Sequence, residues 1–193
     1  MPELDRSTAF NGTTRIAAGP LADVAIAVKR AEEAGARGTV LVFDDGTGRV
    51  VDVWTEGTEE EVRSRYEPRP KAPDVDDSVP RRRGRPKLGV VAREVTLLPR
   101  HWDWLNGQSG GASVALRKLV EEARRASAGA DRVRRAREAA YRFMHALAGD
   151  LAGFEEATRA LFAGDRTRFA SETAGWPADV REHAEALGFP ADE

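Results

Sequence analysis

Residues 93–125, REVTLLPRHWDWLNGQSGGASVALRKLVEEARR, hold the pattern that decides the fold of the middle of the chain. A β-prone run, 94–98, leads into Pro99, which suits the first turn of a helix. That helix breaks in the glycine-rich stretch 107–111, and Ser113 is a good N-cap for a second helix. We therefore predict strand, helix, glycine turn and helix. The apolar stripe of the second helix consists of Leu116, Leu119, Val120 and Ala123.

This order resembles the ribbon-helix-helix family of DNA-binding domains, and SVALRKLVEEA is similar to that family's second helix. The resemblance implies a homodimer, because one strand cannot form a sheet alone and two chains must pair their strands into an antiparallel ribbon that enters the major groove. It also implies that the backbone amides of Ser113 and Val114 hold a phosphate. The implied groove-facing positions, counted back from Pro99, are Leu97, Val95 and Arg93.

The groove-facing side chains of this strand are poorly suited to reading bases. Arg93 can make bidentate hydrogen bonds to a base edge, whereas Val95 and Leu97 can only touch thymine methyl groups. Two interpretations stay open. Either the ribbon reads sequence weakly, or the strand packs against another part of the protein.

A basic motif, PRRRGRPK at residues 80–87, precedes the strand. Its core, RGRP at 83–86, resembles the AT-hook, which lies extended in the minor groove of A·T-rich DNA. Proline favours an extended backbone before it, glycine lets the chain approach the groove floor, and the narrow groove attracts arginine. The DNA contacts predicted here are Arg81, Arg82, Arg83, Gly84, Arg85, Pro86 and Lys87, joined by Arg93 and Arg100.

Charge is segregated along the chain. Residues 80–142 carry 16 Lys+Arg against 6 Asp+Glu, a net charge of +10, although the whole chain carries −2. Residues 1–79 carry 10 Lys+Arg and 16 Asp+Glu, and residues 143–193 carry 4 Lys+Arg and 10 Asp+Glu. Each flank therefore has a net charge of −6. A basic block between acidic flanks indicates a polyanionic partner. The alternative is that the flanks neutralise the block within the fold or across a dimer.

Composition divides this α+β protein into four parts. We predict a small βαββ-type domain over 1–66, a Pro/Arg-rich linker with the AT-hook-like motif over 67–89, the ribbon-helix-helix-like segment over 90–126 and an α-helical region over 127–193. The first part follows the order strand, strand, helix, strand, strand, helix.

Local signals place several of these elements. Asn11-Gly12 suits a type I′ hairpin turn, which needs two positive φ angles. Pro20 suits a helix start, and Thr58 with Glu61 has the spacing of a capping box. The face of one packed C-terminal helix is predicted to hold Phe154, Ala157, Leu161 and Phe162.

Over nearly its whole length the chain also resembles the uncharacterised bacterial domain-of-unknown-function family 2239. The matching runs are FNGTTRIAAGPLADV, LVFDDGTGRVVDV, RGRPKLGVVAREVTLLPRHWDWL, GGASVALRKLVEEAR, FEEATRALFAGD and WPADVREH. The resemblance implies no activity, because that family has no assigned function to carry over.

Composition argues against several kinds of site. The chain has no cysteine, which excludes disulfides and thiolate metal sites and favours a cytoplasmic protein. We expect no membrane span and no export signal, since no long apolar window or basic leader is present. The histidines, His101, His145 and His183, lack ligand spacing, so we expect no metal and no cofactor.

These observations favour a homodimeric DNA-binding protein that regulates transcription. The alternative is a protein-protein interaction module with a basic linker and no nucleic-acid role, in which the basic block meets an acidic partner. An enzyme is the third interpretation, but neither a Ser-centred elbow nor a convincing pair of nucleophile and base is present, so we do not expect one.

Overall fold

The computed structural model describes residues 6–36, 38–67, 91 and 93–190. The chain forms two compact units, and the second unit, residues 69–128, is inserted between the two segments of the first. The described part of the first unit comprises residues 6–36, 38–67 and 129–190, and that of the second comprises 91 and 93–128. Strands and helices are both present, so the predicted α+β class is confirmed.

The first unit contains one antiparallel sheet of four strands in the order β2-β1-β3-β4. These strands are β1 (Arg6–Asn11), β2 (Thr14–Pro20), β3 (Val40–Asp44) and β4 (Arg49–Val50). One helix follows each pair of strands: α1 (Leu21–Glu33) follows β2, and α2 (Glu59–Tyr66) follows β4. The predicted order of six elements is therefore confirmed. The capping box is confirmed as well, because Thr58 Oγ1 accepts from the Glu61 amide and the Glu61 carboxylate accepts from the Thr58 amide.

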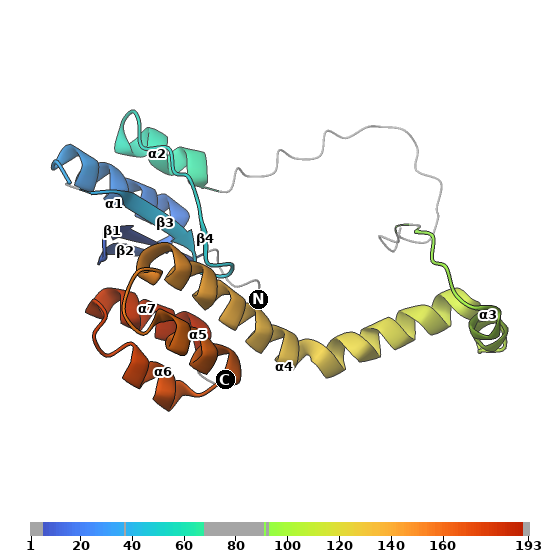
Figure 1. Ribbon diagram of the computed structural model, residues 1–193. Helices are drawn as coiled ribbons and strands as arrows, with labels where there is room; N and C mark the ends of the chain where they lie inside the picture. The colour runs from blue at the N-terminus through green and yellow to red at the C-terminus, as the bar shows by residue number, and fades with distance from the viewer. Residues whose placement is uncertain (1–5, 37, 68–90, 92, 191–193) are drawn as a thin grey trace, which may run out of the picture. The chain divides into compact units, whose positions relative to one another are not determined.

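One face of the sheet is covered by α1. Successive side chains of a strand point to opposite faces, and Ala9 of β1 and Val42 of β3 share this one. They pack against Val24 and Val28, which lie four residues apart on α1 and therefore on one side of that helix. Figure 1 shows α1 and α2 on this side of the sheet and the C-terminal helices on the other.

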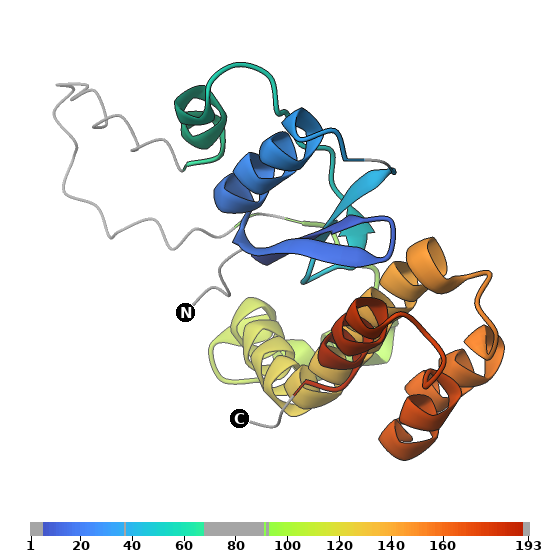
Figure 2. The same cartoon turned by 90° about the vertical axis from the view of Figure 1, so that its left-hand side faces the viewer.

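The opposite face of the sheet packs against helices from the far end of the chain. Phe10 and Phe43 are fully buried there, and the ring of Phe143 lies 5.2 Å from Phe10 and 4.9 Å from Phe43. The same core cluster contains Leu161 and Val180. Figure 2 shows the red α7 below the strands and α1 above them. The helices that build this layer are the end of α4 (Gly111–Ala148), α5 (Phe154–Ala163), α6 (Arg166–Glu172) and α7 (Ala178–Gly188).

The core therefore crosses the divisions made from composition. The ranges 1–66 and 127–193 were predicted as separate parts, but their described residues belong to one unit with one shared core. Composition does not indicate this contact. Each range contains charged residues for a surface and apolar residues for a core, so nothing in it shows that the two ranges share one core.

Three local expectations need correction. The hairpin turn uses Gly12 and Thr13, not Asn11-Gly12, because Asn11 pairs with Thr14 and only Gly12 has a positive φ, 59°. The second strand of the following hairpin is short, since β4 covers only Arg49–Val50. Phe162 is 47% exposed, while Ala157 and Leu161 on the same helix are fully buried. The predicted apolar face of α5 is thus narrower than its sequence suggests.

The helix α4 crosses the boundary that was predicted between residues 126 and 127. It runs without interruption for 38 residues and passes through Gly129. Gly129 has no positive φ and its Cβ position meets open space, so nothing at this glycine ends the helix. A single glycine inside a helix costs only about 1 kcal/mol relative to alanine, and the neighbouring residues outweigh it.

Candidate nucleic-acid interface

The described part of the second unit contains a helix, a glycine turn and the first part of a second helix, preceded by an extended segment. The first, α3 (Pro99–Asn106), starts at Pro99, whose missing N–H is not needed in a first helical turn. The second, α4, starts at Gly111. Gly110 and Gly111 have φ values of 85° and 74°, which glycine adopts without strain. The predicted order of helix, glycine turn and helix is confirmed.

The start of α4 differs from the prediction. Ser113 is not its N-cap, because the helix begins at Gly111 and Ser113 lies inside the first turn. The glycine turn allows this earlier start. The N–H groups of the first three helical residues have no acceptor four residues back within the helix, so the Ser113 amide has no partner there. Val114 is the fourth helical residue, and the residue four positions before it is Gly110, directly before the helix. Arg117 Nε donates to the Ser113 carbonyl oxygen at 3.1 Å.

The segment that precedes α3 forms no strand within one chain. Residues 93–98 carry no strand assignment, and Leu98 at their end has an extended backbone with φ −66° and ψ 150°. Arg93 and Val95 are exposed, as expected for outward positions. Leu97 was expected to point outward too, but it is half-buried and lines a groove beside α3.

The groove is apolar and open, with a volume of about 430 Å³. Leu105 at its base is buried, whereas Trp104 is 54% exposed and Leu119 is 44% exposed. The α3 helix, the start of α4 and the segment before α3 thus leave large apolar side chains in solvent. Exposed apolar patches of this kind mark interaction surfaces in soluble proteins. The lining residues are Leu97, Arg100, His101, Trp104, Leu105, Leu116 and Leu119.

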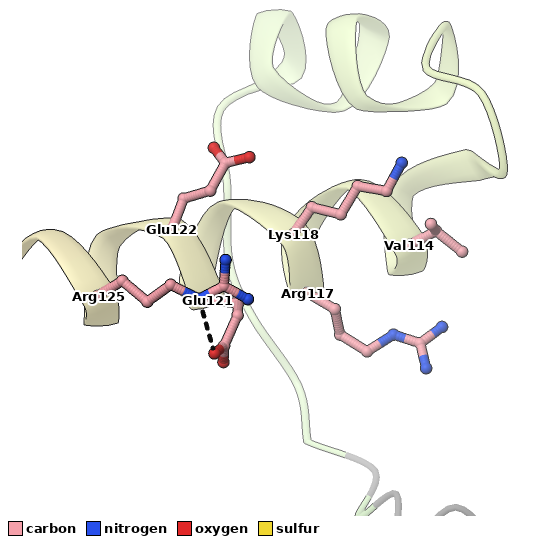
Figure 3. A pocket seen from close by; sticks show the side chains of 6 residues that line it. All are labelled: Val114, Arg117, Lys118, Glu121, Glu122 and Arg125. Atoms are coloured by element: carbon pink, nitrogen blue, oxygen red, sulfur yellow. Dashed lines mark hydrogen bonds and ion pairs between the residues drawn. The ribbon is translucent and has the colours of Figure 1, made fainter.

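A second, charged face runs along α4. Figure 3 shows Arg117 and Glu121 on one side of the helix, with Arg125 paired to Glu121, and Lys118 and Glu122 on the other side. Glu121 Oε1 pairs with Arg124 Nη2 at 3.0 Å and with Arg125 Nε at 3.3 Å. The hydrogen bond from Arg124, followed by its positive charge, lowers the pKa of the Glu121 carboxyl below its usual value. These i,i+3 and i,i+4 pairs mark this face as the solvent side of the helix.

The predicted DNA contacts divide into two sets. Those in the basic motif lie outside the described residues. Arg93, Val95 and Arg100 lie in or beside α3 and are exposed, and the amides of Ser113 and Val114 lie at the start of α4. The residues outside the described ranges are Arg81, Arg82, Arg83, Gly84, Arg85, Pro86 and Lys87.

The histidines occupy different surroundings. His101 and His145 are exposed, and His145 lies beside the ring of Phe154 at 6.3 Å between centroids. His183 is 6% exposed and lies 3.5 Å from Asp45. Within the described ranges, no three His, Cys, Asp or Glu side chains are grouped so that they could hold a metal ion. None of the helices described is long and apolar enough to cross a membrane.

The groove is the feature that sequence reasoning missed. Leu116 and Leu119 were recognised as part of an apolar stripe, but a stripe on a helix normally predicts burial within the chain. A signal for the groove did exist in the sequence. Residues 91–120 contain many large apolar side chains, and the sequence offers only one eight-residue helix and one face of a second helix to cover them.

The comparisons with known proteins place the chain in a family. A family model described as "Uncharacterized protein conserved in bacteria (DUF2239)" matches residues 6–188, so the chain belongs to this family. No curated protein matches the chain, and no solved structure matches it.

Proposed function

We propose that this member of the DUF2239 family is a cytoplasmic protein that binds DNA as a homodimer and regulates transcription. The observation that carries the proposal is the exposure of every Lys and Arg described in residues 93–128. These cations belong to a segment whose helices follow the ribbon-helix-helix order. Exposed cations that neutralise phosphates supply most of the sequence-independent affinity for DNA.

The proposed dimer pairs residues 94–98 of two chains as an antiparallel ribbon. Within one chain this segment lacks a strand partner, and the groove beside it is open to solvent. Pairing would give its backbone amides and carbonyls partners. In such a ribbon the Leu97 side chain turns out of the groove, and Arg93 and Val95 remain on the DNA side.

The proposed contacts have three roles. Arg93 reads a base edge, with Val95 and Leu97 against thymine methyl groups. Arg100 and the amides of Ser113 and Val114 hold phosphates, which fixes the position of the protein on the duplex. The arginines of the basic motif at 80–87 enter the minor groove of A·T-rich DNA, as its resemblance to the AT-hook implies.

Fluorescence anisotropy with labelled A·T-rich and G·C-rich duplexes tests the proposal at two salt concentrations, about 50 and 200 mM. We expect tight binding at low salt, a preference for the A·T-rich duplex and a steep fall in affinity with salt. Replacing the four arginines of the motif should reduce the salt slope by about 0.9 for each phosphate that the protein no longer neutralises. The replacements are Arg81→Ala, Arg82→Ala, Arg83→Ala and Arg85→Ala.

A variant that removes the same number of cations from the first unit is the matched control. This control variant should keep most of the wild-type affinity for DNA and the same dependence of that affinity on salt. Equal effects in the two variants would show that only net charge matters, and absence of binding at low salt would overturn the proposal. The control replacements are Arg49→Ala, Arg65→Ala, Arg159→Ala and Arg166→Ala.

A further inference from the structure

The helix α4 carries an apolar stripe that repeats every three and four residues in alternation. This spacing averages 3.5 residues and is the heptad pattern of a coiled-coil seam, in which two apolar positions per heptad face a partner helix. The stripe continues well beyond the groove beside α3. Its members, defined here as the α4 seam, are Leu116, Leu119, Ala123, Ala126, Ala130 and Val133.

Most of the α4 seam is in solvent in the single chain. Leu119 is 44% exposed and Val133 is 39% exposed, and Val120 at its margin is 63% exposed. The three alanines of the seam are exposed as well. A helix that meets only water has no need of a heptad stripe, so the pattern indicates a partner that is absent from the single chain.

The opposite side of the helix is already assigned to solvent. Arg117, Glu121 and Arg125 lie there and form the charged face seen in Figure 3. Ala128 also lies on that side, about half a turn away from the seam at 100° per residue. A partner helix therefore has one face of α4 to contact, and this is the seam.

The α4 seam and the groove beside α3 adjoin each other. The seam spans residues 116–133, about 27 Å at 1.5 Å per residue. Leu116 and Leu119 also line the groove, so seam and groove form one continuous apolar surface. A stable interface uses roughly 20–30 residues on each side. The seam and the groove hold eleven different residues on each side, so they supply the apolar centre of such an interface and not its full extent.

The surface that complements the seam is the seam itself. The apolar faces of α1, α5 and α7 contribute to the buried clusters of the first unit. Most of the large apolar side chains that remain exposed lie in residues 91–133. Alanines at the centre of the seam let two helices approach closely, and a two-fold pair brings the same patch of each subunit together. We propose that the α4 seams of two copies of this chain pair as a coiled coil.

This inference deepens the homodimer part of the proposed function and does not depend on DNA. Sedimentation velocity of the full chain without DNA tests it, using Ala123→Glu and Ala126→Glu as seam variants. Both alanines are exposed in the single chain, so neither glutamate disturbs its folding. Ala128→Glu is the matched control, because it makes the same change on the charged side of the same helix.

We expect the wild-type chain and Ala128→Glu to sediment as dimers of 21.0 kDa subunits. Each seam variant should raise the dimer dissociation constant by about 100-fold or more, because two glutamates meet in the pair without partners. The chain has no cysteine, so Ala123→Cys and Ala128→Cys give a second measurement. A short bismaleimide should link the first variant into dimers and leave the second as monomers.

Two results would overturn the proposed pairing of the α4 seams. The first is a monomeric wild-type chain, and the second is a pair of seam variants that dimerise as strongly as Ala128→Glu. The second outcome would leave a homodimer held by the ribbon alone. A seam dimer that binds no DNA would refute the proposed function and leave this inference standing.

Discussion

His183 Nε2 on α7 lies 3.5 Å from Asp45 Oδ1, which follows directly after β3. Both atoms are buried, and neither makes a hydrogen bond to any described residue, the other one included. The second carboxylate oxygen of Asp45 accepts from Thr8 Oγ1 at 3.1 Å. One carboxylate thus joins the sheet to the last helix of the chain, across more than a hundred residues of sequence.

Removing this carboxylate should destabilise the first unit. We expect Asp45→Ala to lower the free energy of unfolding by about 1–3 kcal/mol, because Thr8 and His183 lose their buried partner. Asp52→Ala is the control, since Asp52 is exposed and such changes stay within about 0.5 kcal/mol. Urea unfolding followed by circular dichroism measures both. Equal midpoints for the two variants would contradict the role assigned to Asp45.

The shared core predicts that sheet and C-terminal helices unfold together. Phe143 is fully buried against Phe10 and Phe43, so Phe143→Ala should cost about 3–5 kcal/mol. Phe162→Ala removes the same ring from a position that is 47% exposed and should cost far less. Trp54 reports on the sheet side and Trp176 on the C-terminal helices. Trp102 and Trp104 lie in the second unit, so the measurement uses a chain in which both are replaced by Phe. Two separate fluorescence transitions in that chain would be incompatible with one core.

The turn between β3 and β4 has no room for a side chain at Gly48. Its φ is 66°, and a Cβ there would lie 1.9 Å from the Ala139 carbonyl oxygen of α4. Gly48→Ala should therefore cost more than about 2 kcal/mol, from backbone strain and displacement of α4. At Gly46 the nearest heavy atom to such a Cβ is 3.5 Å away. Gly46→Ala should be nearly neutral in the same thermal melt, and a similar destabilisation in both variants would argue against this steric conflict.

The pairing of Glu121 predicts a pH effect on α4. The pKa of Glu121 is lowered by Arg124 first and by Arg125 to a smaller extent. A carboxyl whose folded pKa lies below its unfolded value stabilises the helix above about pH 4.3, and this contribution disappears as the pH falls through the folded pKa.

Carbon-detected NMR titration checks this directly. Arg124→Ala should raise the Glu121 midpoint toward its ordinary value, and Arg125→Ala should raise it less. An unchanged midpoint in Arg124→Ala would mean that the pair does not persist in solution.

Elements set by local chemistry were predictable from the sequence. Thr58 and Glu61 form their capping box because both partners lie within one turn, and Pro99 starts α3 because its ring fixes φ. The order of strands and helices in residues 6–66 follows from similar signals. Each of these needs information from only a few neighbouring residues.

Features that depend on distant partners were not predictable. Nothing near Phe10 indicates that Phe143 covers it, so the two ends of the chain were assigned to separate parts. Gly129 is a usual helix-breaking signal, but a glycine within a strongly helical sequence is tolerated. Leu97 was assigned to one side by strand alternation, although it forms no strand within one chain.

The sheet of the first unit is buried on both faces by segments from opposite ends of the chain, and this has a consequence during synthesis. Phe43 leaves the ribosome 100 residues before Phe143, a delay of roughly 5–20 s at about 5–20 residues per second. Until then the strands carry an uncovered aromatic face. We therefore expect this face to stay accessible to other proteins until the C-terminal helices are made, and slower translation to lengthen its exposure.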